Sequence, residues 1–481
     1  MAAQSTLKCM THPAYRPTLE LVLREALDYL DQVDDRPVRP TASLAELRSR
    51  LGKVLNDESI AANQVLEDLV RDTRGGFLAS TGGRFFAWAI GGSLPAAVGA
   101  DWLTSVWDQN ATLYRSSPAA SVIEEVAGLW LKELLRLPLS ASFAFVNGCQ
   151  MAHATCLAAA RNELLSQRGW DVEKQGLAGS PGCRVIASNR HGSIERAVRL
   201  LGIGEGNVID LPLDATELAT AEALEQALRD TTAGVPTIVI LQAGEFNTGG
   251  FDRFEELIPL AKSHGAWVHI DGAFGLWAAA SSKFDHLLRG CDRADSWVTD
   301  GHKWLNVPFD SGYAFVARGA AHRAAMSVRA SYLVHDPEAR DQINWNPEWS
   351  RRARGFSTYA ALRELGRNGI ADLVNRCCGF AQMLTDGLAE LRGVELLWRP
   401  VLNQGLVRFR HPSAGTEDDH DAYTDTVIQR IVAEGCTFFM GTKWHGHRVM
   451  RISVLNWQTD RQSIDTAIRA VAKCLLPEYG R

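Results

Sequence analysis

Short apolar runs alternate with helical patterns between residues 140 and 320. Seven runs rich in β-branched and aromatic residues are typical of strands: 143–146, 184–187, 208–211, 237–241, 266–270, 296–299 and 312–316. Segments with apolar residues at helical spacing lie between several of them: 151–166, 194–201, 219–230 and 254–264. This alternation predicts an α/β fold, with a mainly parallel seven-stranded sheet and helices on both faces.

The segment before this region is predicted to form a helical arm. Residues 17–72 carry apolar stripes at helical spacing, and the prolines of the segment 37–40 interrupt them. Thr41 or Ser43 is a candidate cap for the helix that follows. Such an arm has little body of its own, so we expect it to pack on another surface, for example a second subunit.

The pattern changes again after residue 330. A polar segment with two prolines and two tryptophans, 336–350, is predicted to be a mobile loop. Beyond it the pattern indicates helices in 358–392, strands in 405–410, 437–440 and 448–454, and helices in 421–434 and 462–475. We predict three parts: an N-terminal helical arm and dimerisation segment (1–110), a large cofactor-binding α/β domain (111–355), and a helical connection with a small C-terminal α+β domain (356–481).

Composition and charge narrow the function classes. A chain of 481 residues is too long for one compact core, and 46% hydrophobic with 22% charged residues is ordinary for a globular protein. The net charge of −6, without a long basic run, argues against nucleic acid or an anionic membrane as a partner. Nine cysteines without metal-site spacing indicate reduced thiols in a cytoplasmic protein and no metal site. We see no signal peptide and no apolar stretch long enough to span a membrane.

Two candidate ligand sites follow the first two predicted strands. Gly148, Cys149 and Gln150 open a helix, whose free N–H groups and dipole suit a phosphate. A plain strand-to-helix turn is the alternative, since glycine is common in such turns. His191 follows the second predicted strand, where it either stacks on a flat ring or serves as a structural histidine.

Two further candidates follow the fifth and sixth predicted strands. Asp271 ends an apolar run, and a carboxylate there is costly unless it meets a partner such as a cationic ring nitrogen. A helix-capping aspartate is the alternative. Asp300, His302 and Lys303 follow the sixth run, at the mouth of the sheet where such folds place their chemistry. Lys303 by itself is equally an ordinary surface lysine.

The four candidates together match the needs of pyridoxal phosphate. A lysine holds this cofactor as a Schiff base, and a carboxylate keeps its pyridine nitrogen protonated so that the ring accepts electrons. A phosphate cradle and a stacking histidine complete the set. The combination is far more specific than any one of its members.

With these four candidates, the sequence closely resembles the group II amino-acid decarboxylases, which have the aspartate-aminotransferase-like fold (fold type I) of pyridoxal-phosphate enzymes. The resemblance covers nearly the whole chain and is densest at 300–308, the segment Asp-Gly-His-Lys-Trp-Leu-Asn-Val-Pro. It also includes the segments 91–95, 101–110, 243–252, 350–355 and 451–457. The resemblance implies a homodimer with its active site between the subunits.

The resemblance also assigns roles to residues of this chain. Lys303 would form the Schiff base, Asp271 would pair with the pyridine nitrogen, and His191 would stack on the ring and help to orient the substrate. The other implied cofactor contacts are Gly148, Cys149 and Gln150 at the phosphate, His302 near it, Asp300, Ala273 beneath the ring, and Asn247 and Thr248 on its hydroxyl side.

This chain departs from the family's pattern at three places. Cys149 and Gln150 stand where the family has a glycine and a hydroxyl residue, so a side-chain donor to the phosphate is lost. Glu245 replaces an uncharged residue, and a carboxylate near an anionic cofactor is unfavourable unless it is paired. The family's loop tyrosine, which protonates the carbanion after carbon dioxide leaves, has no counterpart in 340–349, and Tyr332 lies before that segment.

The resulting hypothesis is decarboxylation of an L-amino acid to the amine and carbon dioxide. The alternatives are oxidative decarboxylation–deamination to an aldehyde, another reaction at Cα, and a regulatory protein that keeps the fold without turnover. Arg352 and Arg354 would either meet a carboxylate, hold the loop, or simply begin a helix. Phe85, Phe86, Trp88 and Trp107 would either line an aromatic pocket or serve packing.

Overall fold

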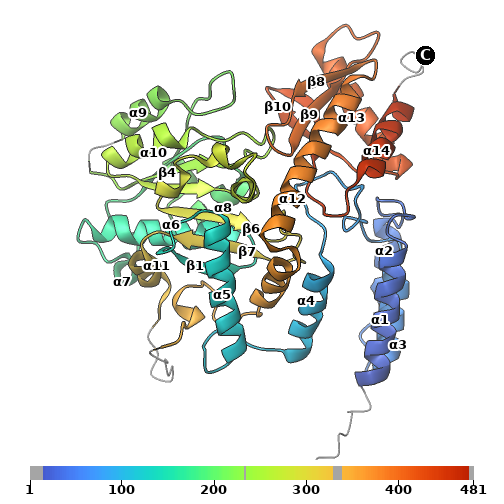
Figure 1. The fold of residues 1–481 in the computed structure, drawn as a ribbon, viewed down its shortest axis with the longest axis horizontal. Helices are drawn as coiled ribbons and strands as arrows, with labels where there is room; N and C mark the ends of the chain where they lie inside the picture. Colours follow the sequence, from blue (N-terminus) through green and yellow to red (C-terminus); the bar gives the residue numbers. More distant parts are fainter. Residues whose placement is uncertain (1–14, 232–233, 329–337, 476–481) are drawn as a thin grey trace, which may run out of the picture.

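A seven-stranded sheet lies at the centre of the computed structural model, which describes residues 15–231, 234–328 and 338–475 (Figure 1). The strand order is β1-β7-β6-β5-β4-β2-β3. Strands β2 to β6 pair in parallel, and β7 is antiparallel to both β6 and β1. The bounds are β1 (Ser142–Val146), β2 (Arg184–Ala187), β3 (Val208–Asp210), β4 (Thr237–Gln242), β5 (Trp267–Asp271), β6 (Ser296–Asp300) and β7 (Gly312–Val316). The predicted fold class is confirmed, and each predicted strand overlaps an observed one.

Alternate residues of the strands enter two separate hydrophobic clusters, one on each face of the sheet. Ile240 and Val298 belong to the cluster around α6, whereas their neighbours Val239 and Trp297 belong to the cluster on the α12 side. Successive side chains of a strand point to opposite faces, so strands covered on both sides are apolar throughout. This explains why the strands were readable from the sequence.

Helices cover both faces of this sheet (Figure 1). The helices of the large domain are α5 (Pro118–Leu134), α6 (Cys149–Ser166), α7 (Val172–Gln175), α8 (Gly192–Leu200), α9 (Ala221–Asp230), α10 (Phe254–Ser263) and α11 (Gly319–Met326). The long α12 (Gly355–Ala389) connects the sheet to the C-terminal domain and packs on α4 (Pro95–Trp107) and α5.

The C-terminal domain has an antiparallel four-stranded sheet in the order β10-β11-β9-β8. Its elements are β8 (Val394–Trp398), β9 (Gln404–Phe409), α13 (Glu417–Glu434), β10 (Met440–Trp444), β11 (His447–Ser453) and α14 (Arg461–Cys474). The half-exposed edge strand β8 was missed. The strand predicted at 437–440 overlaps β10 only at Met440, and Phe438 before it forms an isolated parallel bridge with Phe85, whose ring centroid lies 5.1 Å from its own. Phe439 stacks on Phe86, with ring centroids 5.3 Å apart.

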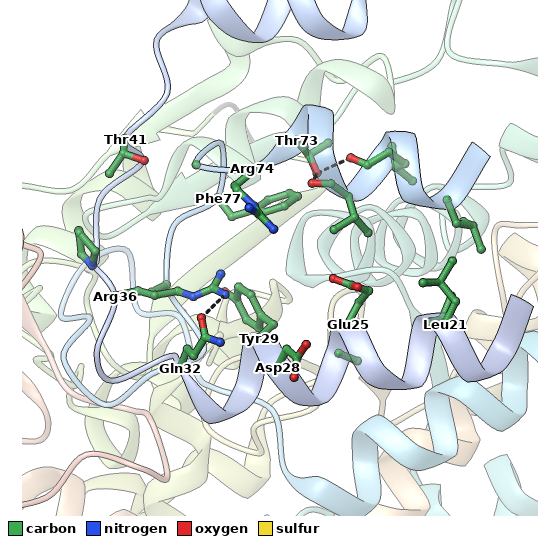
Figure 2. Close-up of a pocket in the computed structure, with 18 of the residues that line it drawn as sticks. Leu21, Glu25, Asp28, Tyr29, Gln32, Arg36, Thr41, Thr73, Arg74 and Phe77 are labelled. Atoms are coloured by element: carbon green, nitrogen blue, oxygen red, sulfur yellow. Dashed lines mark hydrogen bonds between the residues drawn. The ribbon is translucent and has the colours of Figure 1, made fainter. Parts of the chain in front are cut away.

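The N-terminal arm consists of α1 (Tyr15–Asp31), α2 (Leu44–Leu51) and α3 (Ala62–Thr73), and it stands beside the rest of the chain (Figure 1). Ser43 is the cap of α2, in a reciprocal pair of hydrogen bonds with Glu46. A groove of about 990 Å³ lies between α1 and α3, with Leu21 and Phe77 among its lining residues (Figure 2). This groove belongs to the arm, well apart in sequence from the predicted site residues.

The segment 338–350 packs against the large domain, so the mobile loop predicted there is wrong for these residues. The N–H of Ile343 donates to the carbonyl of Thr112 at 3.0 Å, and Asp341 accepts from the N–H of Tyr114 at 2.8 Å. The guanidinium of Arg340 lies 3.9 Å from the centre of the Phe143 ring. The segment thus packs on the residues before α5 and, through Arg340, on Phe143 of β1. Tyr332 lies outside the described residues.

Two further findings concern the described residues as a set. None of the helices within 15–231, 234–328 and 338–475 is long and apolar enough to cross a membrane. The same residues contain no cluster of histidine, cysteine and carboxylate side chains that could hold a metal ion.

The buried His322 of α11 predicts a pH-dependent stability. Its Nδ1 lies 2.9 Å from Ser142 Oγ and its Nε2 2.8 Å from the carbonyl of Trp345, and burial lowers its pKa to about 3. In the unfolded chain this ring takes up a proton below about pH 6.5, whereas the folded chain resists protonation. Stability is therefore lost as the pH falls from about 6.5 towards 3, by up to about 1.4 kcal/mol per pH unit from this group.

We expect His322→Gln to lower the number of protons taken up on unfolding by about one. The free energy of unfolding in urea, measured between about pH 6 and pH 4, should therefore fall less steeply with pH than in the wild type. An unchanged dependence of the unfolding free energy on pH would contradict the assignment to His322.

Candidate active site

The predicted site residues meet at one edge of the sheet. Strand β1 leads into Gly148 and α6, β5 ends on Asp271, and β6 ends on Asp300 shortly before Lys303. Since β1 and β6 are both antiparallel to β7, they run in the same direction, and β5 is parallel to β6. Their carboxyl ends therefore share an edge, which is the usual place for a ligand in an open α/β sheet.

Asp300 connects Lys303 to the beginning of α6. Its Oδ2 lies 3.2 Å from Lys303 Nζ, and its Oδ1 accepts from the N–H of Cys149 at 2.7 Å. Burial by itself would lower the pKa of Lys303, but the charges of Asp300 and Asp271 outweigh it and the pKa is raised. The lysine is thus held as an ammonium group next to a buried carboxylate.

Asp271 is a buried carboxylate that stays ionised. Its Oδ2 lies 3.5 Å from His153 Nε2, and its Oδ1 accepts from the N–H of Ala273 at 3.2 Å. Burial raises the pKa of Asp271, yet the neighbouring His153, His191 and Lys303 more than offset this and hold it well below its usual range. Such a carboxylate suits a cationic partner.

Sequence reasoning missed two histidines behind Asp271. His153 of α6 and His269 of β5 are fully buried, with His153 Nδ1 2.9 Å from His269 Nε2. A signal for both was present in the sequence. His269 precedes Asp271 by two residues and so shares its face of the strand, and His153 lies one helical turn after Cys149.

The turn of Gly148 is packed tightly against its neighbours. A Cβ on Gly312 would lie 2.5 Å from Gly148 Cα, and a Cβ on Gly148 would lie 3.3 Å from His302 Cε1. The His302 ring stacks on Phe309 with centroids 4.3 Å apart, and burial lowers the pKa of His302. Hence His302 lies at the predicted phosphate turn, as a neutral ring at neutral pH.

The donors at this turn differ from the expected set in one respect. The N–H of Cys149 already donates to Asp300, and those of Met151 and Ala152 donate to the carbonyl of Gly148. Burial raises the pKa of the Cys149 thiol, which therefore stays protonated. Gln150 and His302 are then the residues of this turn best placed to bind a phosphate.

One oxygen of Glu245 is held inside the turn that follows β4. Its Oε2 accepts from the N–H of Asn247 at 2.9 Å, and from the N–H and hydroxyl of Thr248 at 2.7 and 2.8 Å. Its Oε1 is buried without a hydrogen-bond partner among the described residues, and burial raises the pKa of Glu245. The hydroxyl of Thr248 is engaged in this turn, and the side chain of Asn247 accepts from Thr442 at 3.2 Å.

His191 lies just before α8. The Nδ1 of His191 accepts from the N–H of Ser193 at 3.2 Å, and its ring centre is 5.8 Å from that of Phe246. The ring keeps contact with solvent, yet desolvation by the surrounding chain lowers the pKa of His191.

Both arginines are paired with carboxylates of the chain itself. Arg352 contacts Asp101 at 2.8 Å, and Arg354 contacts Asp310 at 2.7 Å. Arg352 precedes α12 and fixes α4, whereas Arg354 lies next to the loop that carries Phe309.

The chemistry of this donor set fits pyridoxal phosphate. Lys303 provides an amine that can bond to the aldehyde of the cofactor. Asp271 provides an ionised, buried carboxylate that can pair with the protonated nitrogen of the cofactor ring. Gln150 at the N-terminus of α6, with His302 beside it, provides donors for a phosphate. The close approach of Gly312 and Gly148 leaves no room for a side chain at the turn.

Comparisons with known proteins agree with this arrangement. The family model of the pyridoxal-dependent decarboxylase conserved domain matches residues 46–411. An aromatic-L-amino-acid decarboxylase of Bacillus atrophaeus is 25% identical over 91% of this chain and 90% of its own length. A phenylacetaldehyde synthase of Petunia hybrida is 25% identical over 92% and 90%. The crystal structure of Oryza sativa TDC with PLP and tryptamine has a TM-score of 0.90 at 23% identity, and the match covers 98% of this chain and 99% of that one.

From the contact between Asp300 and Lys303 we predict how the imine formation of Lys303 depends on pH. In Asp300→Asn the charge that favours the ammonium form is lost, so the pKa of Lys303 should fall and imine formation with pyridoxal phosphate should begin at lower pH. The measurement is the absorbance change on mixing apoenzyme with cofactor across a pH series. Asp101→Asn, which disrupts only the pair with Arg352, should leave the midpoint unchanged, and equal midpoints for Asp300→Asn and wild type would disprove the role.

Proposed function

We propose that this chain, which belongs to the family of pyridoxal-dependent decarboxylases, converts an L-amino acid to its amine and carbon dioxide. Its cofactor is pyridoxal 5′-phosphate. The observation that carries the proposal is the pairing of a raised-pKa lysine, Lys303, with Asp300, beside Asp271 held ionised in the same buried site.

The residues of the chain divide the work of this reaction. Bound through Lys303, the cofactor supplies an electron sink for the pair released when the Cα–carboxylate bond breaks. Asp271 holds the proton on the ring nitrogen, as a fixed charge in a water-poor site. Asp300 would keep Lys303 protonated inside the site whenever its amine is not bonded to the cofactor. A proton added at Cα completes the amine.

The remaining site residues are proposed to position the cofactor. Gln150 and His302 bind the phosphate, with Gly148 and Cys149 shaping the turn. Ala273 packs beneath the ring, and its N–H also steadies Asp271. His191 covers the ring from α8. Thr248 contributes through the turn that Glu245 holds, on the hydroxyl side of the ring.

The amine is the first candidate product and an aldehyde the second. The aldehyde hypothesis draws on the missing tyrosine in 340–349, the segment where the resemblance places the proton donor of the family. The similarity to a phenylacetaldehyde synthase supports the aldehyde as the second candidate product. That outcome would consume dioxygen and water, and would release the aldehyde, carbon dioxide, ammonia and hydrogen peroxide.

Aromatic L-amino acids are the substrates that we propose to test first. Several relatives are named for aromatic substrates, including the enzyme of Bacillus atrophaeus. Phe85 and Phe86 are buried in packing with the C-terminal domain, whereas Trp88 keeps 43% of its surface exposed. Trp88 lies just before Gly91, where a Cβ would come within 1.9 Å of the carbonyl oxygen of Lys303. An exposed aromatic ring on a segment that touches Lys303 suits an aromatic substrate.

A homodimer with the active site at the subunit interface is part of the proposal. The face of α1 carries a stripe of leucines that are 45% to 50% exposed: Leu19, Leu23, Leu27 and Leu30. Phe309, which stacks on His302, is 63% exposed. A second copy of the chain would cover apolar surface both on the arm and beside the site.

A cytoplasmic location stays a prediction. It is supported by the free thiols of the eight cysteines in the described part of the chain, which suit a reducing compartment.

Replacing Lys303 tests the cofactor and the reaction together. Lys303→Ala should abolish the near-visible absorbance that borohydride bleaches, and with it the release of carbon dioxide from the common L-amino acids. The exposed Lys283→Ala is the matched control and should retain both. Amine without peroxide would support simple decarboxylation, whereas peroxide and ammonia would support the aldehyde reaction. A wild-type protein without the absorbance would refute both.

Charges placed on the leucine stripe test the dimer. Leu23→Glu combined with Leu27→Glu should shift the protein from dimer to monomer in sedimentation velocity, with loss of activity, because the stripe would no longer pack on a partner. Leu200→Glu changes an exposed leucine of α8, 64% exposed, and should remain dimeric. Wild-type protein that sediments as a fully active monomer would overturn the proposal.

A further inference from the structure

A chain of buried polar groups leads from the core to the back of Asp271. Trp267 Nε1 donates to Ser296 Oγ at 2.9 Å, and the same oxygen lies 2.8 Å from His269 Nδ1. His269 Nε2 is 2.9 Å from His153 Nδ1, and His153 Nε2 is 3.5 Å from Asp271 Oδ2. Trp267, His269 and Asp271 alternate along β5 and so face the same side, towards α6.

The chemistry of the two ends sets a direction for this chain. An indole N–H can only donate, and an ionised carboxylate can only accept. Ser296 can therefore accept from Trp267 and donate to His269 Nδ1. A neutral imidazole has one donor and one acceptor, so His269 donates from Nε2 to His153 Nδ1. The hydrogen of His153 is then left on Nε2, which has no hydrogen-bond partner among the described residues and lies 3.5 Å from Asp271 Oδ2. Every hydrogen then points towards Asp271.

We propose that His153 is a positioning residue for the cofactor's ring nitrogen, and that His269 and Ser296 hold His153 in the tautomer that donates to Asp271. The inference rests on the proposed role of Asp271. It adds that the carboxylate needs a donor on the side turned away from the cofactor.

The physical reason lies in competition for one proton. Without His153, Asp271 would lose a donor in a site from which water is excluded, and its pKa would rise. A more basic carboxylate takes the proton from the ring nitrogen and weakens the electron sink. The other titratable groups that lower the pKa of Asp271 are His191 at the beginning of α8 and Lys303 after β6, and both lie outside the buried chain.

Packing alone does not account for the two histidines. Both rings are fully buried among apolar residues of the α6 face, where a hydrophobic pair would avoid the cost of burying polar atoms. His322 is also fully buried, but it satisfies Ser142 and Trp345 near the opposite edge of the sheet. It is therefore a matched control for replacing a buried histidine.

The test compares four variants by cofactor affinity and by the pH dependence of the bound cofactor's absorbance. His153→Leu removes the donor and should weaken binding of pyridoxal phosphate about tenfold or more, as expected for a change of about one pKa unit, and move the absorbance midpoint. His153→Gln can keep an N–H near the position of Nε2 and should stay within about threefold of wild type. His322→Gln should leave both readings unchanged. Ser296→Ala should act in the direction of His153→Leu with a smaller effect.

The outcomes separate this inference from the proposed function. Asp271→Ala is measured alongside, and unchanged cofactor affinity there would refute the role of Asp271 itself. If Asp271→Ala weakens binding but His153→Leu does not, the inference about His153 fails alone. Equal losses in His153→Gln and His153→Leu would also overturn it, since the N–H would not matter. If His153→Leu does not fold, Ser296→Ala with wild-type affinity and midpoint overturns the inference.

Discussion

The burial of two carboxylates, Asp271 and Asp300, is the constraint on which this site depends. Both end parallel strands at one edge of the sheet, and both are almost completely removed from solvent. A buried charge is tolerated only when it is paired and hydrogen-bonded. The groups that contact these two carboxylates are ones to which we assign roles in the proposed reaction: Lys303, the N-terminus of α6, and the histidines behind Asp271.

The position of Lys303 also depends on contacts between distant parts of the chain. Asn306 accepts from the N–H groups of Gly92 and Trp457 at 2.6 and 3.0 Å, and its amide donates to the carbonyls of Trp304 and Leu455. One buried side chain thus ties the loop after Lys303 to both the N-terminal segment and the C-terminal domain. The hydrogen bonds of Asn306 therefore both hold the loop that carries Lys303 and connect the domains.

The strands and the residues at their carboxyl ends were largely predictable from the sequence. Buried strands appear in it as continuous apolar runs, and these runs end where polar residues begin. Lys303, Asp271 and Asp300 were found in that way. Histidines inside apolar segments, such as His153 and His269, were not, since their partners come from other elements. The segment 336–350 was interpreted as a mobile loop because of its polar composition, whereas Asp341 accepts from the N–H of Tyr114 and the carbonyl of Arg340 accepts from Ser121 of α5.

The charges of the site bear on the step after carbon dioxide is lost. At neutral pH the lowered pKa of His191 leaves its ring uncharged, while the raised pKa of Lys303 leaves its amine protonated. Asp300 Oδ2 lies 3.2 Å from Lys303 Nζ and stabilises that ammonium. Formation of an amine needs a proton at Cα, and formation of an aldehyde needs dioxygen to arrive first. A lysine held as an ammonium is therefore consistent with the amine that we propose as the product.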